Sequence, residues 1–476
     1  MQERSGGVLD FPLCPTDLAD METPNPLAVQ WGRFGLGPTT GASAGDARAA
    51  VEAQLSRRLP TADTLPTAAQ QIVTMQEKRL YAAERNKEKV AESRGMTAGD
   101  TSPRTPAGPA PRGVQRDQEL ASWLSGVIGG SPPLQERLAL HWGNFFTVSA
   151  VKGKVGVTVG PFQREAIRPH LSGRFHDMLV ASTTHAAMLF YLDNDVSVGP
   201  DSMVGQRKQS GLNENLAREL LELHTLGVDG GYSQQDVTNL AAVLTGWIVN
   251  LNINSPSCGE TMFDPRRHQP GAQRILGKTY ADTGRDQLMA VLTDLARHPA
   301  TARHVARRLA RSFVGDKASP ALIATLERSF HETDGDLPTL ARVLVRQDEC
   351  WTTPLAKMRP PLEFMALTSL LIGRVPEPPP PDLALVAMGQ PFLAPPSPKG
   401  WAEEDGAWVT SDGMKTRLDW TQNVANRHAE ELDVKALING PLKPLLSDET
   451  RSAVMGGESR EQALTLLLMS PDLQRR

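Results

Sequence analysis

The sequence predicts a mainly α-helical protein, a multi-helical compact domain with long Pro/Gly-rich loops and few or no strands. Along most of the chain, apolar residues recur at spacings of three and four, the pattern of a helix with one buried face. Most of these segments have Gly, Pro or Asp at their ends, as helices commonly do. Strict two-residue alternation is rare, and KVGVTV at 154–159 is the best candidate for a strand.

The length and composition are ordinary for a globular protein. The chain has 476 residues, of which 40% are hydrophobic and 22% are charged, so it contains ample apolar material for a core. A formal net charge of -4 provides no general attraction to nucleic acid or to an anionic membrane, and we expect no nucleic-acid partner. Cys14, Cys258 and Cys350 are odd in number and far apart, which argues against a disulfide framework and against a thiolate zinc site.

The sequence shows no targeting or membrane segment. Its first residues, MQERSGGVLDFPLCPTDLAD, lack the basic region and apolar run of a secretory signal. No stretch of about 18 apolar residues occurs, so we expect no membrane span. These features predict a cytoplasmic protein.

Composition divides the chain into successive parts. They are a disordered N-terminus (1–25), an N-terminal helical arm (26–96), a flexible Pro/Gly-rich loop (97–115) and a helical core (116–476) with a Pro-rich break at 375–400. In the arm, the helix expected at 66–95 has a thin apolar stripe and dense charges, so we expect it to be solvated on most sides.

Within the core, helical periodicity predicts a succession of helices joined by turns. The segments DQELASWLSGVIGG and PPLQERLALHWGNFFTV are separated by a break at GGSPP. Further helices are predicted at 161–181, 183–193, 213–226, 233–246, 284–297, 299–314, 319–331 and 335–349, and SREQALTLLLMSPDL forms a last short amphipathic helix.

Capping residues mark the turn between the helices at 213–226 and 233–246. Asn213 is a plausible N-cap of the first helix and Gly227 a plausible C′ residue. Ser233 and Asp236 have the spacing of a capping box for the second helix. The segment LGVDGGYS is therefore expected to be a tight turn.

The helix at 213–226 has two polar residues on its leucine-rich face. On a helical wheel, Glu219 and His224 fall within the leucine arc, about 140° apart. A buried carboxylate costs several kcal/mol unless it is paired, so each residue needs a partner from elsewhere in the fold. One interpretation is a structural network, with His224 near a helix C-terminus. The other is a buried acid/base or metal-ligand pair.

The pool for a buried polar centre contains His141, His185, Glu219, His224 and His268. Candidate catalytic residues are Glu219, His224 and His185, and candidate metal ligands are these three with His268. Imidazole and carboxylate together suit zinc, iron or manganese, so the candidate cofactor is a divalent transition metal. The chain has no HExxH, CxxC or paired ExxH motif to support it. His141 is expected to face solvent.

The segment HPATARHVARRLARSF (298–313) predicts a helix with a basic face. The residues on that face are His304, Arg307, Arg308 and Arg311. The face suits either an anion or nucleic-acid surface, or a solvated surface paired with acids such as Asp294 or Asp316. We favour the second interpretation because the whole chain is slightly acidic.

The loop MGQPFLAPPSPKGWAEEDGAW (388–408) is too rich in Pro and Trp to be helical. It suits a partner-binding loop, because Trp and Pro are frequent on recognition surfaces. Alternatively, Trp401 and Trp408 plug the core, which we favour because large aromatic side chains are mostly buried.

Several segments carry, in a fixed order, a likeness to a known family. They are WGRFGLGPT (31–39), ERLALHWGNFFTVS (136–149), THAAMLFYLDN (184–194), NENLARELLELHTLGVDGGYSQQDV (213–237), LTGW (244–247), HPATARHVARRLARSFV (298–314), PPLEF (360–364), MGQPFLAPPSPKGW (388–401) and MSPDLQ (469–474). Together they resemble the bacterial family labelled domain of unknown function 1800. The likeness covers the chain from about residue 26 to its end.

This resemblance implies an all-helical fold and no assigned activity. Members of the family often look exported and encoded beside a partner family, which implies a protein partner encoded nearby. The chain departs from the family pattern Trp-x-Asn-His-Phe, because Phe145 stands in place of the histidine. Ala186 replaces the proline after His185, and Gln269 replaces the aspartate after His268. Two contributors to any acid/base or metal centre are therefore missing.

Three functions are consistent with these observations. The favoured one is a partner-binding or supporting protein in which Glu219 and His224 belong to a structural buried network. The alternative is an enzyme with a buried Glu/His acid/base or metal-assisted centre and an unknown substrate. The third is a nucleic-acid binder that uses the helix at 299–314. Phe145 and Gln269 favour the first, because they replace groups that a catalytic centre would need.

Overall fold

The computed structural model describes residues 23–39, 45, 47–60, 64–93, 112–208, 211–377 and 379–476. Within these ranges the protein consists almost entirely of helices, with two small two-stranded antiparallel sheets, so the predicted mainly α-helical fold is confirmed. Most of the expected disordered N-terminus and of the expected flexible loop lies outside the described residues. None of the helices in the described ranges combines the length and apolar content needed to cross a lipid bilayer.

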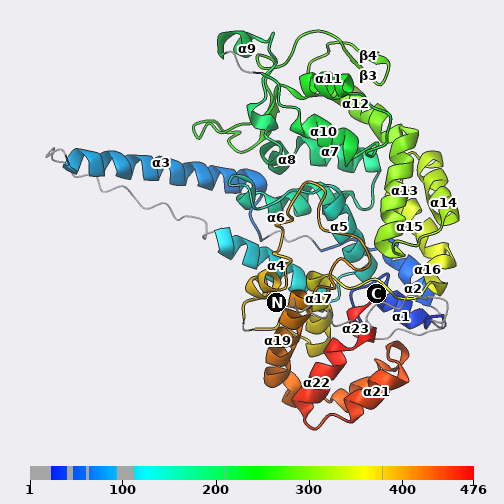
Figure 1. Cartoon of the computed structure of the whole chain (residues 1–476). Coiled ribbons are helices and arrows are strands. Elements are labelled where there is room, and N and C mark those ends of the chain that lie inside the picture. The colour runs from blue at the N-terminus through cyan, green and yellow to red at the C-terminus, as the bar shows by residue number, and fades with distance from the viewer. Residues whose placement is uncertain are drawn as a thin grey trace, which may run out of the picture.

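The N-terminal elements lie against the body of the molecule, except for one long helix. They are α1 (Pro26–Gly32), α2 (Ala47–Ala53), η3 (Gln54–Ser56), α3 (Ala68–Ser93), α4 (Arg112–Ile128) and α5 (Pro133–Phe145). Figure 1 shows α3 extending away from the other helices. Only its base is packed, because Ile72 is fully buried whereas Leu80 is 49% exposed. The thin apolar stripe of this helix accounts for its exposure.

A second group of elements extends from the middle of the molecule, where α6 lies beside α5, to one end, which contains α7 to α12 (Figure 1). Its helices are η4 (Val155–Val157), α6 (Val159–Phe162), η5 (Gln163–Ile167), η6 (Arg168–His170), α7 (Phe175–Thr184), α8 (Ala186–Tyr191), η7 (Asn194–Val196), α9 (Met203–Lys208), α10 (Asn215–Glu222), α11 (Gln234–Leu244) and α12 (Arg285–Arg297). Its strands are β1 (Trp247–Val249), β2 (Thr261–Phe263), β3 (Gln273–Ile275) and β4 (Lys278–Tyr280). Ile248 of β1 faces Met262 of β2, and Arg274 of β3 faces Thr279 of β4.

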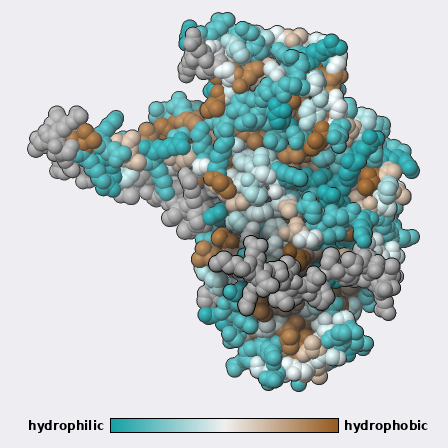
Figure 2. Space-filling view, viewed as in Figure 1, coloured by the Kyte–Doolittle hydropathy of each residue, from teal (hydrophilic) through white to brown (hydrophobic). Residues whose placement is uncertain are grey.

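The remaining helices cover one side of the body and form its opposite end (Figure 1). Along the side lie α13 (Pro299–Phe313), α14 (Pro320–Glu332), α15 (Leu337–Arg346) and α16 (Glu349–Thr352). The opposite end contains α17 (Pro361–Ile372), α18 (Pro381–Ala387), α19 (Ser411–His428), η8 (Ala429–Glu431), α20 (Val434–Asn439), η9 (Lys443–Leu445), α21 (Asp448–Met455), α22 (Arg460–Met469) and α23 (Pro471–Gln474). Figure 2 shows a mainly hydrophilic surface with separate hydrophobic patches.

Two sequence predictions of local structure are wrong. KVGVTV at 154–159 forms helical turns and not a strand, because Val155 and Val159 are four residues apart and bury on the same side. The helix predicted at 161–181 is broken into α6, η5, η6 and α7. Pro169 and Gly173 interrupt it, since proline lacks a backbone donor and glycine weakens helices.

The structure confirms the capping box predicted before α11, but the caps predicted for the preceding helix are wrong, since the N-cap of α10 is Glu214 and its C-cap is Leu223. Ser233 and Asp236 form the expected capping box, and Gly227 has a positive φ of 86°. Asn213 accepts a hydrogen bond from the backbone of Asn215 at 2.9 Å, at the start of α10. Local sequence therefore determines where α11 begins, whereas Asn213 and Gly227 lie in the turns before and after α10 and do not cap it.

The apolar interior consists of two clusters. The larger one extends from α1 to α16 and includes Trp142, Phe146 and Leu220. The smaller one joins α4 to the helices from α17 to α23 and includes Leu124 and Phe364. Helix α5 lies between them, since its Leu138 belongs to the larger cluster and its Leu140 packs on the smaller one.

Buried arginines connect the N-terminal segment to distant parts of the chain. Arg33 is fully buried, and its guanidinium donates hydrogen bonds to backbone carbonyls. The acceptors are Phe313 (2.9 Å), Cys350 (2.6 Å), Thr353 (3.0 Å) and Pro354 (3.0 Å). Burial lowers the pKa of Arg33 only to about 10, so the group stays charged at neutral pH. One side chain therefore connects α1 to the ends of α13 and α16.

Replacing Arg33 with methionine is expected to destabilise the protein by about 3 kcal/mol or more, because several buried carbonyls lose a charged donor. Urea unfolding followed by circular dichroism measures this change. The matched control is Arg303→Met, which removes an exposed arginine paired with Glu327 at 3.3 Å and should cost less than about 1 kcal/mol. Equal losses of stability in the two variants would contradict the role assigned to Arg33.

Candidate functional site

Glu219 and His224 do not lie on one helix. Helix α10 ends at Glu222, and His224 belongs to the following turn, where its backbone N–H donates to the Glu219 carbonyl at 3.0 Å. The helical wheel that placed both residues on one leucine face is therefore wrong beyond Glu222, because the chain leaves the helix there. Glu219 is half-buried, and burial raises the pKa of its carboxyl, with Glu222 adding to the effect.

His224 is buried against the aromatic core. Its ring centroid lies 5.3 Å from that of Phe146. Burial lowers the pKa of His224 to about 3, and the nearby Arg308 adds to this effect. The imidazole is therefore neutral at pH 7.

His185 and His268 each have partners of their own. His185 is the N-cap of α8, where its Nδ1 accepts from the backbone of Ala187, and its Nε2 lies 3.1 Å from the Glu165 carboxylate. His268 donates from Nδ1 to the Thr245 carbonyl at 2.9 Å. In the described part of the chain, no three or more His, Cys, Asp or Glu side chains form a group that could hold a metal ion. The catalytic and metal-ligand assignments of His185, Glu219, His224 and His268 stay sequence predictions.

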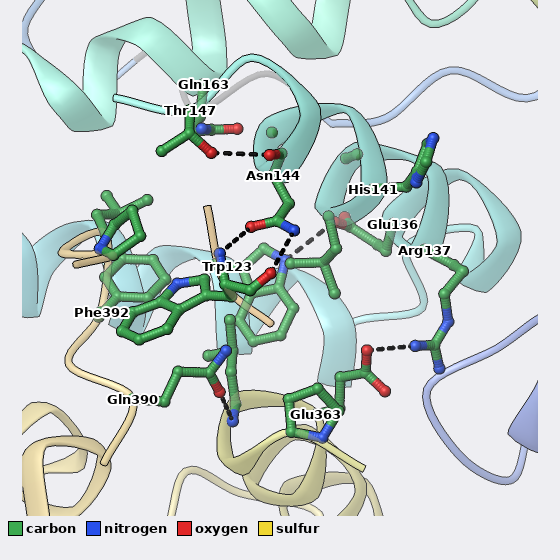
Figure 3. Close-up of a pocket in the computed structure, with 18 of the residues that line it drawn as sticks. Trp123, Glu136, Arg137, His141, Asn144, Thr147, Gln163, Glu363, Gln390 and Phe392 are labelled. Atoms are coloured by element: carbon green, nitrogen blue, oxygen red, sulfur yellow. Dashed lines mark hydrogen bonds and ion pairs between the residues drawn. The ribbon is translucent and has the colours of Figure 1, made fainter. Parts of the chain in front are cut away.

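The structure contains a cavity of about 260 Å³ between the two apolar clusters. Its walls come from α4, α5, η5, α17 and the segment 388–408. In Figure 3, Glu136 and Asn144 point from α5 toward the centre, while Glu363, Gln390 and Phe392 line other sides. Pockets commonly occur where two structural units meet, so this position suits a binding site.

Much of the cavity wall is aromatic or aliphatic. The aromatic side chains are Trp123, Phe392, Trp401 and Trp408. The rings of Trp401 and Trp408 contact each other, with centroids 5.8 Å apart. Both tryptophans are only partly buried, so they form a wall of the cavity and do not plug the core as expected.

The segment 388–408 is attached to the end of α5. Asn144 donates from Nδ2 to the Trp401 carbonyl at 3.1 Å and accepts from the Trp401 backbone N–H at 2.7 Å. Ser149 donates to the Pro395 carbonyl at 2.7 Å. Gly400 has a φ of 87°, and a Cβ there would lie 2.5 Å from the Asn144 Oδ1, so this position requires glycine. These contacts fix the tryptophan wall relative to the helix.

Four of the five glutamates in the cavity wall are each paired with an arginine. Arg168 binds Glu136 through two hydrogen bonds of 2.9 Å, and Trp123 donates to the same carboxylate at 3.0 Å. The other pairs are Arg164 with Glu119 (3.1 Å), Arg137 with Glu363 (2.5 Å) and Arg308 with Glu403 (2.8 Å). Two-pronged arginine–carboxylate pairs fix the position of both groups.

The interpretation of the basic face of α13 as solvated is wrong for Arg308, which is largely buried and paired with Glu403. Both side chains are only 14% exposed. Burial alone would raise the pKa of Glu403, but the Arg308 guanidinium holds that pKa below its usual range. Arg311 does pair with Asp316, at 3.1 Å, as expected. Asp294, the other expected partner, pairs with Lys278.

His141 lines the cavity and does not face solvent as the sequence suggested. It is 3% exposed, because α5 packs on both apolar clusters. Its ring lies edge-on to Trp142, with centroids 5.0 Å apart. Among the described residues, neither ring nitrogen has a hydrogen-bond partner. Burial lowers the pKa of His141 to about 4, so the ring is neutral at pH 7.

Comparison with known protein families identifies the family of the chain. The sequence pattern of the family described as "Protein of unknown function (DUF1800)" matches residues 30–475. The chain belongs to this family. No curated protein and no solved structure matches it. The family description names no activity, so the residues of the cavity provide the evidence on function.

The cavity of this DUF1800 protein is built largely from segments that carry the family likeness. The segments 136–149, 360–364 and 388–401 all contribute to its walls. Sequence reasoning missed Glu136 and Glu363 because a glutamate in an amphipathic helix resembles a surface residue. The available signal was that these three segments, which are far apart in sequence, are among those that carry the likeness.

Phe145, where the resemblance led us to expect a histidine, is buried beside the cavity. The Arg308 guanidinium lies 5.2 Å from its ring centroid, and the ring of His304 lies 5.5 Å away. His304 donates from Nε2 to the Leu223 carbonyl at 3.0 Å. In this member of the family, Phe145 therefore supports the arginine that holds Glu403.

The stability of the protein is expected to fall as the pH falls from about 6.5 to about 4. The pKa of His141 and His304 is lowered to about 4 and that of His224 to about 3, chiefly by burial. In the unfolded chain these groups bind protons below about pH 6.5, so each weakens folding by up to about 1.4 kcal/mol per pH unit in this window. Urea unfolding at several pH values measures the slope.

His224→Phe should make this slope smaller, because one of the groups that takes up a proton on unfolding is removed. The control is His331→Gln, at an exposed position of α14, which should leave the slope as it is. An unchanged slope in His224→Phe would contradict the assignment of a buried neutral His224.

Proposed function

We propose that this DUF1800 protein binds a small, largely apolar organic molecule in the cavity between α4, α5, α17 and the segment 388–408. The observation that carries the proposal is the cavity itself, which has an aromatic and aliphatic wall and a few fixed polar groups. Small-molecule sites in proteins usually have this composition. The proposal differs from the partner-binding or supporting function expected from the sequence, whose partner was a protein, because the site is a cavity of about 260 Å³.

The polar groups of the cavity are held in place without a ligand. Glu136 is oriented by Arg168 and Trp123, and Gln390 accepts a hydrogen bond from the Leu362 backbone at 2.7 Å. Gln390 lines the cavity, and its Nε2 adds a hydrogen-bond donor to the wall. Fixed groups lower the entropic cost of binding, which supports a binding role.

The ionisation state of the buried carboxylates in the cavity wall supports a binding role more than a role in acid/base catalysis. Burial would raise the pKa of Glu363, but Arg137 and Arg476 hold that pKa below its usual range. Arg308 has the same effect on Glu403. Carboxylates kept ionised by arginines are poor general acids.

Filling the cavity should prevent binding. Leu140 lines the cavity, and Leu140→Trp places a larger side chain in the space. Fluorescence titration with the neutral apolar dye phenylnaphthylamine is expected to give saturable one-to-one binding to the unmodified protein. The Leu140→Trp variant should bind at least about tenfold more weakly, the equivalent of about 1.4 kcal/mol of lost contact.

The control variant is Leu383→Trp. Leu383 is 56% exposed on α18 and does not line the cavity, so this variant should bind the dye like the unmodified protein. Circular dichroism verifies that both variants are folded. The proposal fails if the unmodified protein shows no saturable binding, or if the two variants bind equally.

A further inference from the structure

One end of the cavity has an excess of buried positive charge. Arg137 and Arg476 both contact Glu363, at 2.5 and 2.8 Å, and all three side chains line the cavity. The Arg359 guanidinium also acts on this carboxylate. Each of the four side chains is less than a tenth exposed. Among the described residues, three guanidinium groups thus surround one glutamate side chain, so positive side chains outnumber negative ones at this end of the cavity.

The other charged groups nearby do not offset this excess. Lys357 lines the same cavity and is also buried. Its ammonium donates to the carbonyl oxygens of Arg311 and Glu403, and it lies 3.4 Å from the Asp405 carboxylate, which balances its charge. Glu403 is already paired with Arg308. We call the group formed by Arg137, Arg359, Glu363 and Arg476 the arginine cluster. These neighbouring charges do not cancel its positive charge.

Unpaired hydrogen-bonding groups lie at the same end. Among the described residues, both ring nitrogens of His141 and the Nε of Arg137 lack a partner. His141 is 3% exposed and lines the cavity. The charges that act on its ring are those of Glu403, Arg308 and Arg476, of which the first is a carboxylate already paired with Arg308. Buried polar groups in native proteins are nearly always paired with protein, water or a ligand, so these atoms indicate a missing partner.

We propose that the ligand of this cavity is an organic anion, with an apolar body against the tryptophan wall and a carboxylate, sulfonate or phosphate group beside the arginine cluster and His141. This inference rests on the proposed function, because it assigns a chemical class to the molecule that the cavity binds. An oxyanion would accept from the imidazole N–H and from Arg137, and would neutralise the excess charge. Arginines are well suited to this recognition because their planar donors match oxyanion geometry.

Two dyes with the same rings test the inference in the unmodified protein. Anilinonaphthalene sulfonate is phenylnaphthylamine with an added sulfonate. We expect the sulfonate dye to bind at least about tenfold more tightly than the neutral dye, as charge-assisted hydrogen bonds imply. We also expect octanoate to displace the bound neutral dye at concentrations at least about tenfold lower than octanol does.

Removing the negative charge at the arginine cluster should tighten sulfonate binding, whereas a loss of structure would weaken it. Glu363→Gln removes the glutamate carboxylate of the cluster, so the ratio of sulfonate-dye affinity to neutral-dye affinity should rise at least about fivefold. Glu458→Gln makes the same charge change at an exposed position between α21 and α22, and should leave this ratio as it is. His141→Leu should lower the ratio, because the sulfonate loses the imidazole donor.

The outcomes separate the two proposals. If neither dye binds, the proposed function fails, and this inference fails with it. If both dyes bind equally and octanoate displaces no better than octanol, the cavity binds apolar molecules and the inference of an anion is overturned. A ratio of sulfonate-dye to neutral-dye affinity that does not rise in a folded Glu363→Gln protein would also overturn it. Should Glu363→Gln fail to fold, the two dyes and the octanoate comparison decide the question in the unmodified protein.

Discussion

The fold depends on buried guanidinium groups that bind backbone carbonyls far away in the sequence. Arg33 holds the ends of α13 and α16. Arg137 donates to the carbonyls of Gly32 and Gly35, and Arg476 donates to that of Ser312 at 3.0 Å. A buried charge costs several kcal/mol unless its donors are satisfied, so these contacts permit few alternative arrangements of the segments. They hold the N-terminal segment and the last residues together around α5 and α17.

This framework explains why a cavity persists between two apolar clusters. Helix α5 contributes Leu138 to one cluster and packs Leu140 on the other, while Arg137 and Glu136 on the same helix form ion pairs. Both helix faces are therefore occupied, and α5 cannot move to close the space. The segment 388–408 covers one side through the bonds between Asn144 and Trp401. A binding site with a fixed shape requires this kind of rigid support.

Sequence reasoning located the candidate site only in part. It found that polar groups are buried in the core, and His224 is indeed buried. It placed the polar centre at Glu219 and His224, whereas the cavity lies at Glu136, Asn144 and Glu363. The helical wheel assumes that a helix continues, and α10 ends at Glu222. The pairing of carboxylates with arginines far away in sequence leaves no local pattern from which it could be predicted.

The sequence by itself determined the helical class and many helix ends. Periodicity and capping depend on neighbouring residues, as the capping box at Ser233 illustrates. Only the tertiary structure decided which polar residues are buried together. Arg137, Glu363 and Arg476 come from three distant segments, and their meeting depends on how two apolar clusters pack around α5. Such contacts depend on packing in three dimensions. The spacing of residues along the chain does not predict them.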